Sequence, residues 1–248
     1  MNERFVKCAQ RGEEWLQAHC GKLSASNAPD VMNFRKDGKE GADRKAYRGK
    51  KLAEVVTGLL DNYNFVSKAM EYGIAFEDEA RRAYTLRTGQ MVDQIGYVIH
   101  PTMERVICSP DGLIGDDGGL EIKVPETSTF LRWVDAGVVP EEHRQQMYMQ
   151  MACAGLQWVD FCAYDPRMPK ALLGTDGKRY DCRLFIRRLE ADAKEIAKLE
   201  DGFAQILREI DADIASLPKF FPEAEPEPEI EAPQGEEWLQ EIDFEGLK

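Results

Sequence analysis

The 248-residue sequence predicts an α/β (α+β) protein with a mixed central β-sheet flanked by helices. Segments with apolar residues at helical spacing alternate irregularly with short strand-like segments. The one sharp change of composition follows Phe221, so everything before it is expected to form one domain. The length is ample for a well-buried core, and 43% hydrophobic with 31% charged residues is typical of a globular protein.

Two helices are expected in the first hundred residues. Residues 44–57 repeat apolar side chains at helical spacing, and Gly58 follows as a stop signal. A second helix is expected from about 72 to 88 and also ends before a glycine. The apolar residues of this second helix share one face, which places Glu77 at the border of that face.

Strand signals follow at residues 91–99, 105–108 and 120–124, and the last two are separated by a turn at residues 116–119. In the third strand Glu121 and Lys123 point to one face and the apolar residues to the other. The remaining expected elements are a helix at 140–155, strands at 158–164 and 182–188, and a helix at 190–217.

Charge is distributed unevenly along the chain. Residues 221–248 hold ten acids and one base, so this segment carries −9 of the net charge of −13. We expect a domain at residues 1–220, followed by an acidic Pro/Glu-rich linker and a short C-terminal tail, because the alternating Glu/Pro stretch cannot bury apolar surface. The apolar residues beyond the linker either dock on a partner or on this chain, or form disordered chain without a function.

A basic segment lies between Arg35 and Lys51, where eight bases face three acids. Its residues Arg44, Lys45 and Arg48 are candidates for contacts with DNA phosphates, and a solvated loop and helix face is the alternative.

The sequence also indicates the compartment. No apolar run approaches the roughly 20 residues of a membrane helix, and the first twelve residues are too charged for a secretory signal. We expect a cytoplasmic protein that does not enter a membrane. Six separated cysteines without a CxxC pair indicate reduced thiols and not a zinc site or a disulfide framework.

The chemistry is concentrated in residues 109–125, where Asp111 precedes Glu121 by ten residues and Lys123 follows two residues later. A turn between the carboxylates would bring them together, and two converging carboxylates form the hard oxygen site that Mg²⁺ prefers. A lysine beside such a site can orient water or stabilise charge on a phosphate. This set meets the requirements of phosphodiester hydrolysis, whereas a surface hairpin with unrelated charges is the bland alternative.

Several separated motifs occur in one order over residues 10–190. They are GEEW (12–15), GKLSAS (21–26), LAEVVTG (52–58), YGIAFEDEA (72–80), SPDGL (109–113), LEIKVP (120–125) and YDPRM (164–168). This set resembles the lambda exonuclease family, which includes the YqaJ-type viral recombinases and belongs to the PD-(D/E)XK nuclease superfamily. The resemblance implies a restriction-endonuclease-like core.

The resemblance also implies roles for single residues. Asp111 and Glu121 would be metal ligands together with the backbone carbonyl of Ile122, and Lys123 would be the catalytic lysine. Glu77 matches an upstream glutamate that lies near the metals and holds a second ion through water. A solvated helix glutamate is the alternative for Glu77.

Gln146 matches the glutamine of the helix that borders the family's active site. The competing interpretation is a glutamine-rich solvent face, because Gln145 and Gln150 are close by.

The family grips a 5′-terminal phosphate with an arginine and serines. Ser26 and Ser109 match the serines, and Ser26 could also serve as a plain helix N-cap. His19 stands where the arginine would align, and a neutral histidine lacks the bidentate fork of arginine. Phosphate capture is therefore expected to be weaker, or to be supplied by another base such as Lys22.

The function implied is that of a Mg²⁺-dependent exonuclease that degrades linear double-stranded DNA from 5′ to 3′, giving mononucleotides and a 3′ single-stranded overhang. The family further implies two ions per site, with Mn²⁺ as a candidate substitute, a homotrimeric ring on DNA ends and a single-strand annealing protein as partner. The alternatives are an endonuclease or repair nuclease of the same superfamily, and a non-catalytic DNA-end-binding recombination module.

Overall fold

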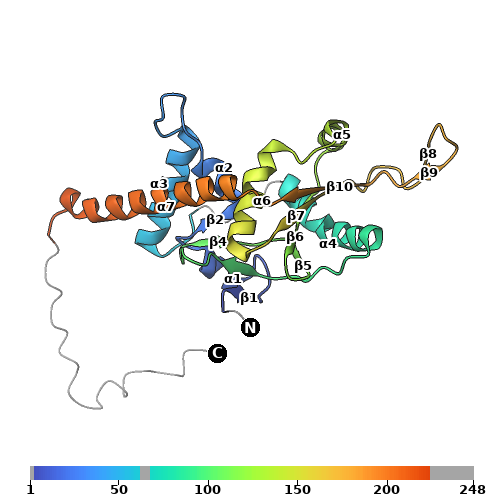
Figure 1. Cartoon of the computed structure of the whole chain (residues 1–248). Coiled ribbons are helices and arrows are strands. Elements are labelled where there is room, and N and C mark those ends of the chain that lie inside the picture. Colours follow the sequence, from blue (N-terminus) through green and yellow to red (C-terminus); the bar gives the residue numbers. More distant parts are fainter. Residues whose placement is uncertain (1–2, 62–67, 224–248) are drawn as a thin grey trace, which may run out of the picture. The chain divides into compact units, whose positions relative to one another are not determined.

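The computed structural model describes residues 3–61 and 68–223 (Figure 1). Its contacts divide the chain into two units, Met1–Ile214 and Ala215–Lys248. The elements in order are β1 (Phe5–Val6), α1 (Glu13–His19), β2 (Leu23–Ser24), η1 (Ala25–Asn27), α2 (Ala28–Val31), α3 (Ala42–Thr57), α4 (Lys68–Thr88), β3 (Tyr97–Ile99), β4 (Val106–Cys108), β5 (Gly112–Ile114), β6 (Gly118–Lys123), α5 (Thr127–Ala136), α6 (Glu141–Ala154), β7 (Trp158–Tyr164), β8 (Leu172–Leu173), β9 (Arg179–Tyr180), β10 (Leu184–Glu190), α7 (Ala193–Ser216) and η2 (Leu217–Phe220).

Helices and mixed sheets confirm the predicted α+β class, but the described strands form two four-stranded sheets and a small hairpin in place of one central sheet. The first sheet has the order β1-β3-β4-β2 and the second has the order β10-β7-β6-β5. Each sheet mixes parallel and antiparallel pairs, with β2 parallel to β4 and β6 parallel to β7. The hairpin β8-β9 stands apart from both sheets (Figure 1).

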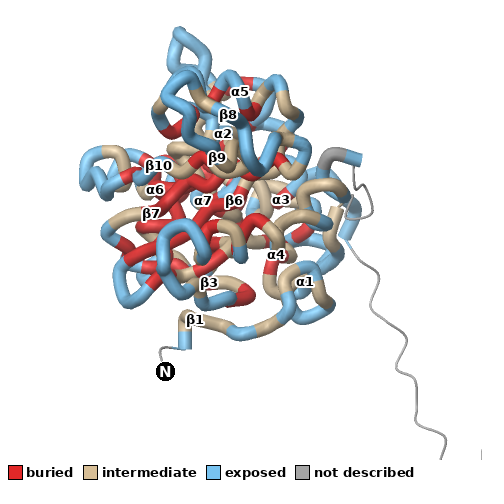
Figure 2. The backbone as a smooth tube through the Cα atoms, turned by 90° about the vertical axis from the view of Figure 1, so that its right-hand side faces the viewer, coloured by how far each residue is buried: buried red, intermediate tan, exposed pale blue. Residues whose placement is uncertain are grey.

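The second sheet carries the strands of the candidate site and is covered by helices on both faces. Val159, Phe161 and Ala163 of β7 belong to a core shared with α5, α6 and α7. Cys162 and Tyr164 alternate with them and join a second core with α4. This alternation follows from the two-residue period of a strand. Figure 2 shows β6 and β7 as a largely buried centre.

The sheet pairing corrects one expectation about the carboxylates. The strand expected at residues 105–108 is observed as β4, but β4 lies in the first sheet and does not pair with β6. The neighbour of β6 is β5, which was not expected and which begins directly after Asp111. Asp111 therefore approaches Glu121 from the start of β5.

Most other expected elements are present with shifted ends. The helices expected at 44–57, 72–88, 140–155 and 190–217 are α3, α4, α6 and α7. Of the strand expected at 91–99, residues 97–99 form β3, and the strand expected at 182–188 runs from Leu184 to Glu190. Helices α1 and α5 were not expected. Most of the predicted acidic tail, residues 224–248, lies outside the described residues.

All six cysteines lie in the described part of the chain and are free thiols, three of them buried. None of the described helices is both long enough and apolar enough to cross a membrane.

Candidate active site

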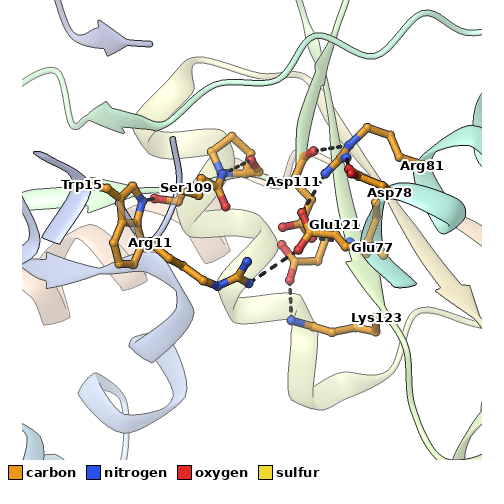
Figure 3. A network of polar contacts seen from close by, with 12 residues as sticks. Arg11, Trp15, Glu77, Asp78, Arg81, Ser109, Asp111, Glu121 and Lys123 are labelled. Carbon is orange, nitrogen blue, oxygen red and sulfur yellow. Dashed lines mark hydrogen bonds and ion pairs between the residues drawn. The ribbon is translucent and has the colours of Figure 1, made fainter. Parts of the chain in front are cut away.

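A cavity of about 380 Å³ collects eight of the residues that the sequence singles out. They are Ser26, Glu77, Ser109, Asp111, Glu121, Ile122, Lys123 and Gln146. These residues come from the segment between β2 and α2, from α4, from the start of β5, from β6 and from α6. The fold therefore brings together positions that are separated by as many as 120 residues in sequence. Figure 3 shows the carboxylates with their basic neighbours.

Glu121 is held by three donors and is only 2% exposed. Gln146 on α6 donates from Nε2 to Oε1 at 2.7 Å, and Gln150 donates from Nε2 to Oε2 at 2.6 Å. The Nζ of Lys123 lies 2.5 Å from Oε1. Two amides and an ammonium thus fix the direction of this carboxylate inside the cavity.

Gln150 is a site residue that the sequence interpretation missed. It is 1% exposed, so a solvent-facing glutamine surface is wrong for this residue. Its spacing could have identified it. Gln150 follows Gln146 by four residues, and residues four apart on a helix share a face. Gln145 does not line the cavity.

Asp111 lies opposite Glu121 at the start of β5. Its Oδ2 accepts a hydrogen bond of 2.6 Å from the backbone N–H of Ile122 on β6. Burial raises the pKa of Asp111 well above its ordinary value of 3.8, and the nearby carboxylates of Glu121 and Glu77 raise it further. Negative charges therefore lie close together in this site, and a bound cation would offset the repulsion between them.

Lys123 compensates part of this negative charge. Burial alone would lower the pKa of Lys123, but the nearby carboxylates of Glu121, Asp111 and Glu77 outweigh that effect and raise the pKa above 10.5. The ammonium group is therefore charged at neutral pH, and its side chain is 31% exposed towards the cavity.

Glu77 lies on α4, at the border of the apolar face as expected. Its Oε1 accepts a hydrogen bond of 2.7 Å from Nη2 of Arg81. Its Oε2 lies 3.5 Å from Nη2 of Arg11. Glu77 is thus bound by two arginines, neither of which the sequence interpretation had singled out.

The phosphate-binding candidates near the N-terminus are arranged differently from the expectation. His19 is 7% exposed, stacks on the ring of Trp15 and donates from Nδ1 to the Trp15 carbonyl at 2.6 Å. Burial lowers the pKa of His19 to about 4, so the ring is neutral at neutral pH. His19 does not line the cavity, and Lys22 does not line it either. The Nζ of Lys22 donates to the carbonyl of Ala18 instead.

The serine candidates do line the cavity. Ser109 accepts a hydrogen bond of 2.8 Å from Nε1 of Trp15 and lies 3.3 Å from Nε2 of His19. Ser26 lies inside η1, and its hydroxyl is 3.0 Å from that of Ser24. The N-cap positions of η1 and α2 are taken by Ser24 and Asn27, so the N-cap alternative for Ser26 is not observed.

Two of the three DNA-binding candidates in the basic segment form internal ion pairs. Arg44 is 1% exposed and pairs with Glu40 and Glu209, which is incompatible with the expected DNA contact. Arg48 pairs with Glu40 and Asp213. Of the three DNA candidates on α3, Lys45 is exposed.

The donor set fits a hard divalent cation. Asp111 and Glu121 supply carboxylate oxygens, and the buried Oε1 of Gln150 has no hydrogen-bond partner among the described residues. In the described part of the chain no group of three His, Cys, Asp or Glu side chains is arranged to hold a metal by itself. Two carboxylates are the kind of oxygen donors that a hard divalent cation takes, since such an ion can bind through one or two carboxylates and keep several waters.

The chain is similar to known nucleases over most of its length. A model of the YqaJ-like viral recombinase domain matches residues 14–157. The crystal structure of an alkaline exonuclease, LHK-Exo from Laribacter hongkongensis, is 36% identical, has a TM-score of 0.73, and matches over 84% of this chain and 97% of that chain. The structure of LHK-Exo in complex with dAMP gives the same identity and coverage with a TM-score of 0.74.

A phage-related exonuclease from Haemophilus somnus 129PT shares the fold at 14% identity, with a TM-score of 0.58 over 79% of this chain and 96% of that chain. The comparison with curated proteins gave no match. The family match covers more than half of the chain, and the alkaline exonuclease, at 36% identity, matches 84% of the chain. The chain therefore belongs to the YqaJ-like viral recombinase family and is an alkaline-exonuclease-like nuclease.

Proposed function

We propose that this nuclease is a Mg²⁺-dependent exonuclease that degrades linear double-stranded DNA from 5′ to 3′, releasing mononucleotides and leaving a 3′ overhang. The observation that carries the proposal is the single cavity into which Asp111, Glu121 and Lys123 project. The similarity to an exonuclease crystallised with dAMP supports mononucleotides as products, because dAMP is a deoxynucleoside monophosphate.

In this proposal the chain's own groups divide the work. Asp111 and Glu121 would hold the divalent ion, with the Ile122 carbonyl as the expected further ligand. When bound, such an ion supplies Lewis-acid activation of water and neutralises charge on the phosphate. Lys123, held by Glu121, would orient the attacking water and stabilise negative charge on the phosphate. Gln146 and Gln150 keep Glu121 in one orientation.

The residues that remain have narrower proposed roles. Glu77 would hold a second ion through water, from its place between Arg11 and Arg81. Mn²⁺, another hard cation that takes oxygen ligands, is expected to substitute for Mg²⁺. The proposed partners are duplex DNA ends, two further copies of this chain in a ring, and a single-strand annealing protein.

One assay tests polarity and catalysis together. Linear duplexes labelled at either the 5′ or the 3′ end are incubated with Mg²⁺, and the released products are sized over time. We expect labelled mononucleotides at once from the 5′-labelled strand, and progressively shortened labelled strands from the 3′-labelled strand. Release of mononucleotides first from 3′ ends would contradict the proposed polarity.

Two controls separate the rival functions. Cleavage of circular duplex DNA would favour an endonuclease. Glu121→Ala and Glu121→Gln should abolish nucleotide release, whereas Glu141→Ala on α6, whose side chain is 85% exposed, should leave it unchanged. Nucleotide release that Glu121→Gln does not change would point to a contaminating nuclease and leave only the non-catalytic DNA-end-binding alternative.

A further inference from the structure

Arg81 on α4 contacts both its own helix and the sheet that carries the candidate site. Its Nη2 donates to Oε1 of Glu77, one turn earlier on α4, at 2.7 Å. Its Nε donates to the backbone carbonyl of Asp111, at the start of β5, at 3.1 Å. A third contact runs from Nη1 to the carboxylate of Asp78. Figure 3 shows this guanidinium group beside Asp78 and Asp111. One planar group therefore connects Glu77 on a helix with Asp111 on a strand.

Arg81 is a neighbour of the active-site cavity and does not line it. Its side chain is 9% exposed and lies on the wall of an adjoining cavity of about 520 Å³. The two cavities have Glu77 and Asp111 in common. Any effect of Arg81 on the chemistry of the active-site cavity is therefore exerted through these two residues.

Apolar packing does not fix Glu77 by itself. Helix α4 begins at Lys68, but Ala80 is the first buried side chain among those described on this helix. Ala80 and Tyr84 pack against the second sheet. Glu77 precedes this packed part of the helix, and its side chain is 19% exposed. The contact of Arg81 with the Asp111 carbonyl is thus a polar connection from this region of α4 to the sheet.

Asp111 is held from two directions. Strand β6 holds it through its carboxylate, which accepts from the N–H of Ile122 at 2.6 Å, and through its own N–H, which donates to the Leu120 carbonyl at 3.1 Å. Helix α4 holds its carbonyl through Arg81. The connection requires donors on Nε and Nη2 that diverge in one plane, and a lysine ammonium, with all its protons on one atom, does not provide them.

We propose that Arg81 is a positioning residue that sets the separation between Glu77 and Asp111, so that both carboxylates can reach the divalent ions of the proposed site. This inference rests on the proposed nuclease function and adds a residue that acts through the expected ligands. It gives Arg81 on α4 the role towards Glu77 that Gln146 and Gln150 on α6 have towards Glu121. Groups that orient metal ligands typically change metal affinity or activity 10- to 100-fold.

The test compares Arg81→Lys, which keeps the charge and removes the planar fork, with Arg81→Gln, which removes both. Arg82→Gln is the matched control, because Arg82 is the next residue, is exposed and does not line the active-site cavity. Values of kcat and KM are measured on linear duplex DNA in Mg²⁺. Binding of Mn²⁺ is titrated without DNA by electron paramagnetic resonance, and urea unfolding gives the folded fraction of each variant.

We expect both Arg81 variants to lose kcat by about 10- to 100-fold with KM for DNA unchanged, because the contacts of Arg81 are with the expected ligands. The dissociation constant for Mn²⁺ should rise by about 10-fold in the folded protein. Arg82→Gln should match the wild type in all three measurements. A purely structural role would lower the stability and leave kcat and Mn²⁺ binding of the folded fraction unchanged, which would overturn the inference.

A double-mutant cycle with Glu77→Gln tests whether Arg81 acts through Glu77. We expect Arg81→Gln to cost less activity in the Glu77→Gln protein than in the wild type, since the carboxylate to be positioned is already lost. Additive losses would contradict the inference, and so would full activity and Mn²⁺ affinity in Arg81→Lys, or a change in KM alone. Failure of the proposed function is recognised separately, by absence of nucleotide release from the wild type, because the Mn²⁺ titration uses no DNA.

Discussion

Asp111 illustrates how a functional residue can oppose folding. Its carboxylate is buried near those of Glu121 and Glu77, and burial followed by these two charges raises its pKa. A raised carboxylate pKa means that the charged form is disfavoured in the folded protein relative to the unfolded chain. At neutral pH, without a cation, this crowding makes the native state less stable.

Replacing Asp111 by asparagine should therefore separate stability from activity. The amide oxygen can still accept from Ile122, while one negative charge is lost. We expect the metal-free Asp111→Asn protein to melt a few degrees higher than the wild type, corresponding to about 1 kcal/mol. Nuclease activity should be lost. Mg²⁺ should raise the melting temperature of the wild type and not of the variant, and equal Mg²⁺ stabilisation of both would contradict a metal site at Asp111.

A substitution of Gln150 should also separate the effect on activity from the effect on stability. Gln150→Leu removes the donor to Glu121 and also a buried acceptor that has no partner among the described residues. We expect activity or metal affinity to fall about 10- to 100-fold, as is usual for groups that orient a ligand, with stability unchanged or increased. Gln145→Leu, next to it and outside the cavity, is the control. Parallel losses of activity and stability would indicate a packing role instead.

His19 predicts a pH dependence of stability. Burial lowers its pKa from 6.5 to about 4. Between pH 6.5 and pH 4, His19 is therefore protonated in the unfolded chain but neutral in the folded protein. The stabilisation is complete above pH 6.5 and is lost as the pH falls towards 4. It amounts to about 2 kcal/mol lost at pH 5.

We expect His19→Gln to be less stable than the wild type at pH 8, and this difference to shrink by about 2 kcal/mol at pH 5 when both are unfolded in urea. His143, whose pKa burial also lowers to about 4, is present in both proteins and cancels in the comparison. A difference that does not change with pH would show that His19 is charged or exposed.

At the scale of elements, helices with a clear apolar period and a glycine stop were predictable, as α3 and α6 show. The three-residue strand β5 was not, because Gly112–Ile114 is too short for a period-two pattern and gains its pairing from β6. Sheet membership was equally hidden, since β4 and β5 lie next to each other in sequence but in different sheets. The sequence still placed Asp111, Glu121 and Lys123 together. Asp111 precedes a strand that pairs with β6, although this strand is β5 and not β4.

The basic face of α3 shows the limit of charge counting. Counting bases cannot distinguish a solvated arginine from one whose partners come from a helix 165 residues away, as for Arg44 and Glu209. The structure assigns Arg44 to the contact between α3 and α7, where it also donates to the Val31 carbonyl. Lys45, its neighbour on the same helix, is exposed.

This difference in burial predicts a large loss of stability for substitution of Arg44 and almost none for substitution of Lys45. Arg44→Met leaves Glu40 and Glu209 without their buried partner and should cost about 3 kcal/mol of unfolding free energy. Lys45→Met should change stability by less than about 0.5 kcal/mol. If Lys45 contacts a DNA phosphate, its variant instead lowers the salt slope of binding by about 0.9. Urea unfolding and anisotropy measured on both variants check this, and similar stability losses would contradict the assignment of Arg44.

At the scale of the whole molecule, the net charge of −13 opposes the binding of DNA unless the distribution of that charge is considered. Residues 221–248 carry −9, so the preceding 220 residues carry only −4. Within that part the cavity carries two cations, Arg11 and Lys123, beside its carboxylates.

A ring of three chains, as we propose, would let an acidic exterior coexist with a bore that attracts DNA. A solution mass three times the 28.2 kDa of one chain is the expected result by light scattering.

The acidic segment then predicts how the full chain and a variant lacking residues 222–248 differ in DNA binding. If the segment competes with DNA for basic groups, its removal strengthens duplex binding at low salt. The gain shrinks as salt rises, because the screening length falls from about 30 Å at 0.01 M to about 8 Å at 0.15 M. If the segment instead recruits the annealing protein, its removal leaves DNA binding unchanged and lowers the affinity for that partner. Anisotropy with duplex DNA across salt concentrations, together with a pull-down of the annealing protein by each variant, distinguishes the two. Unchanged behaviour in both measurements would reduce the segment to a linker, since neither its charge nor its apolar residues would then contribute to recognition.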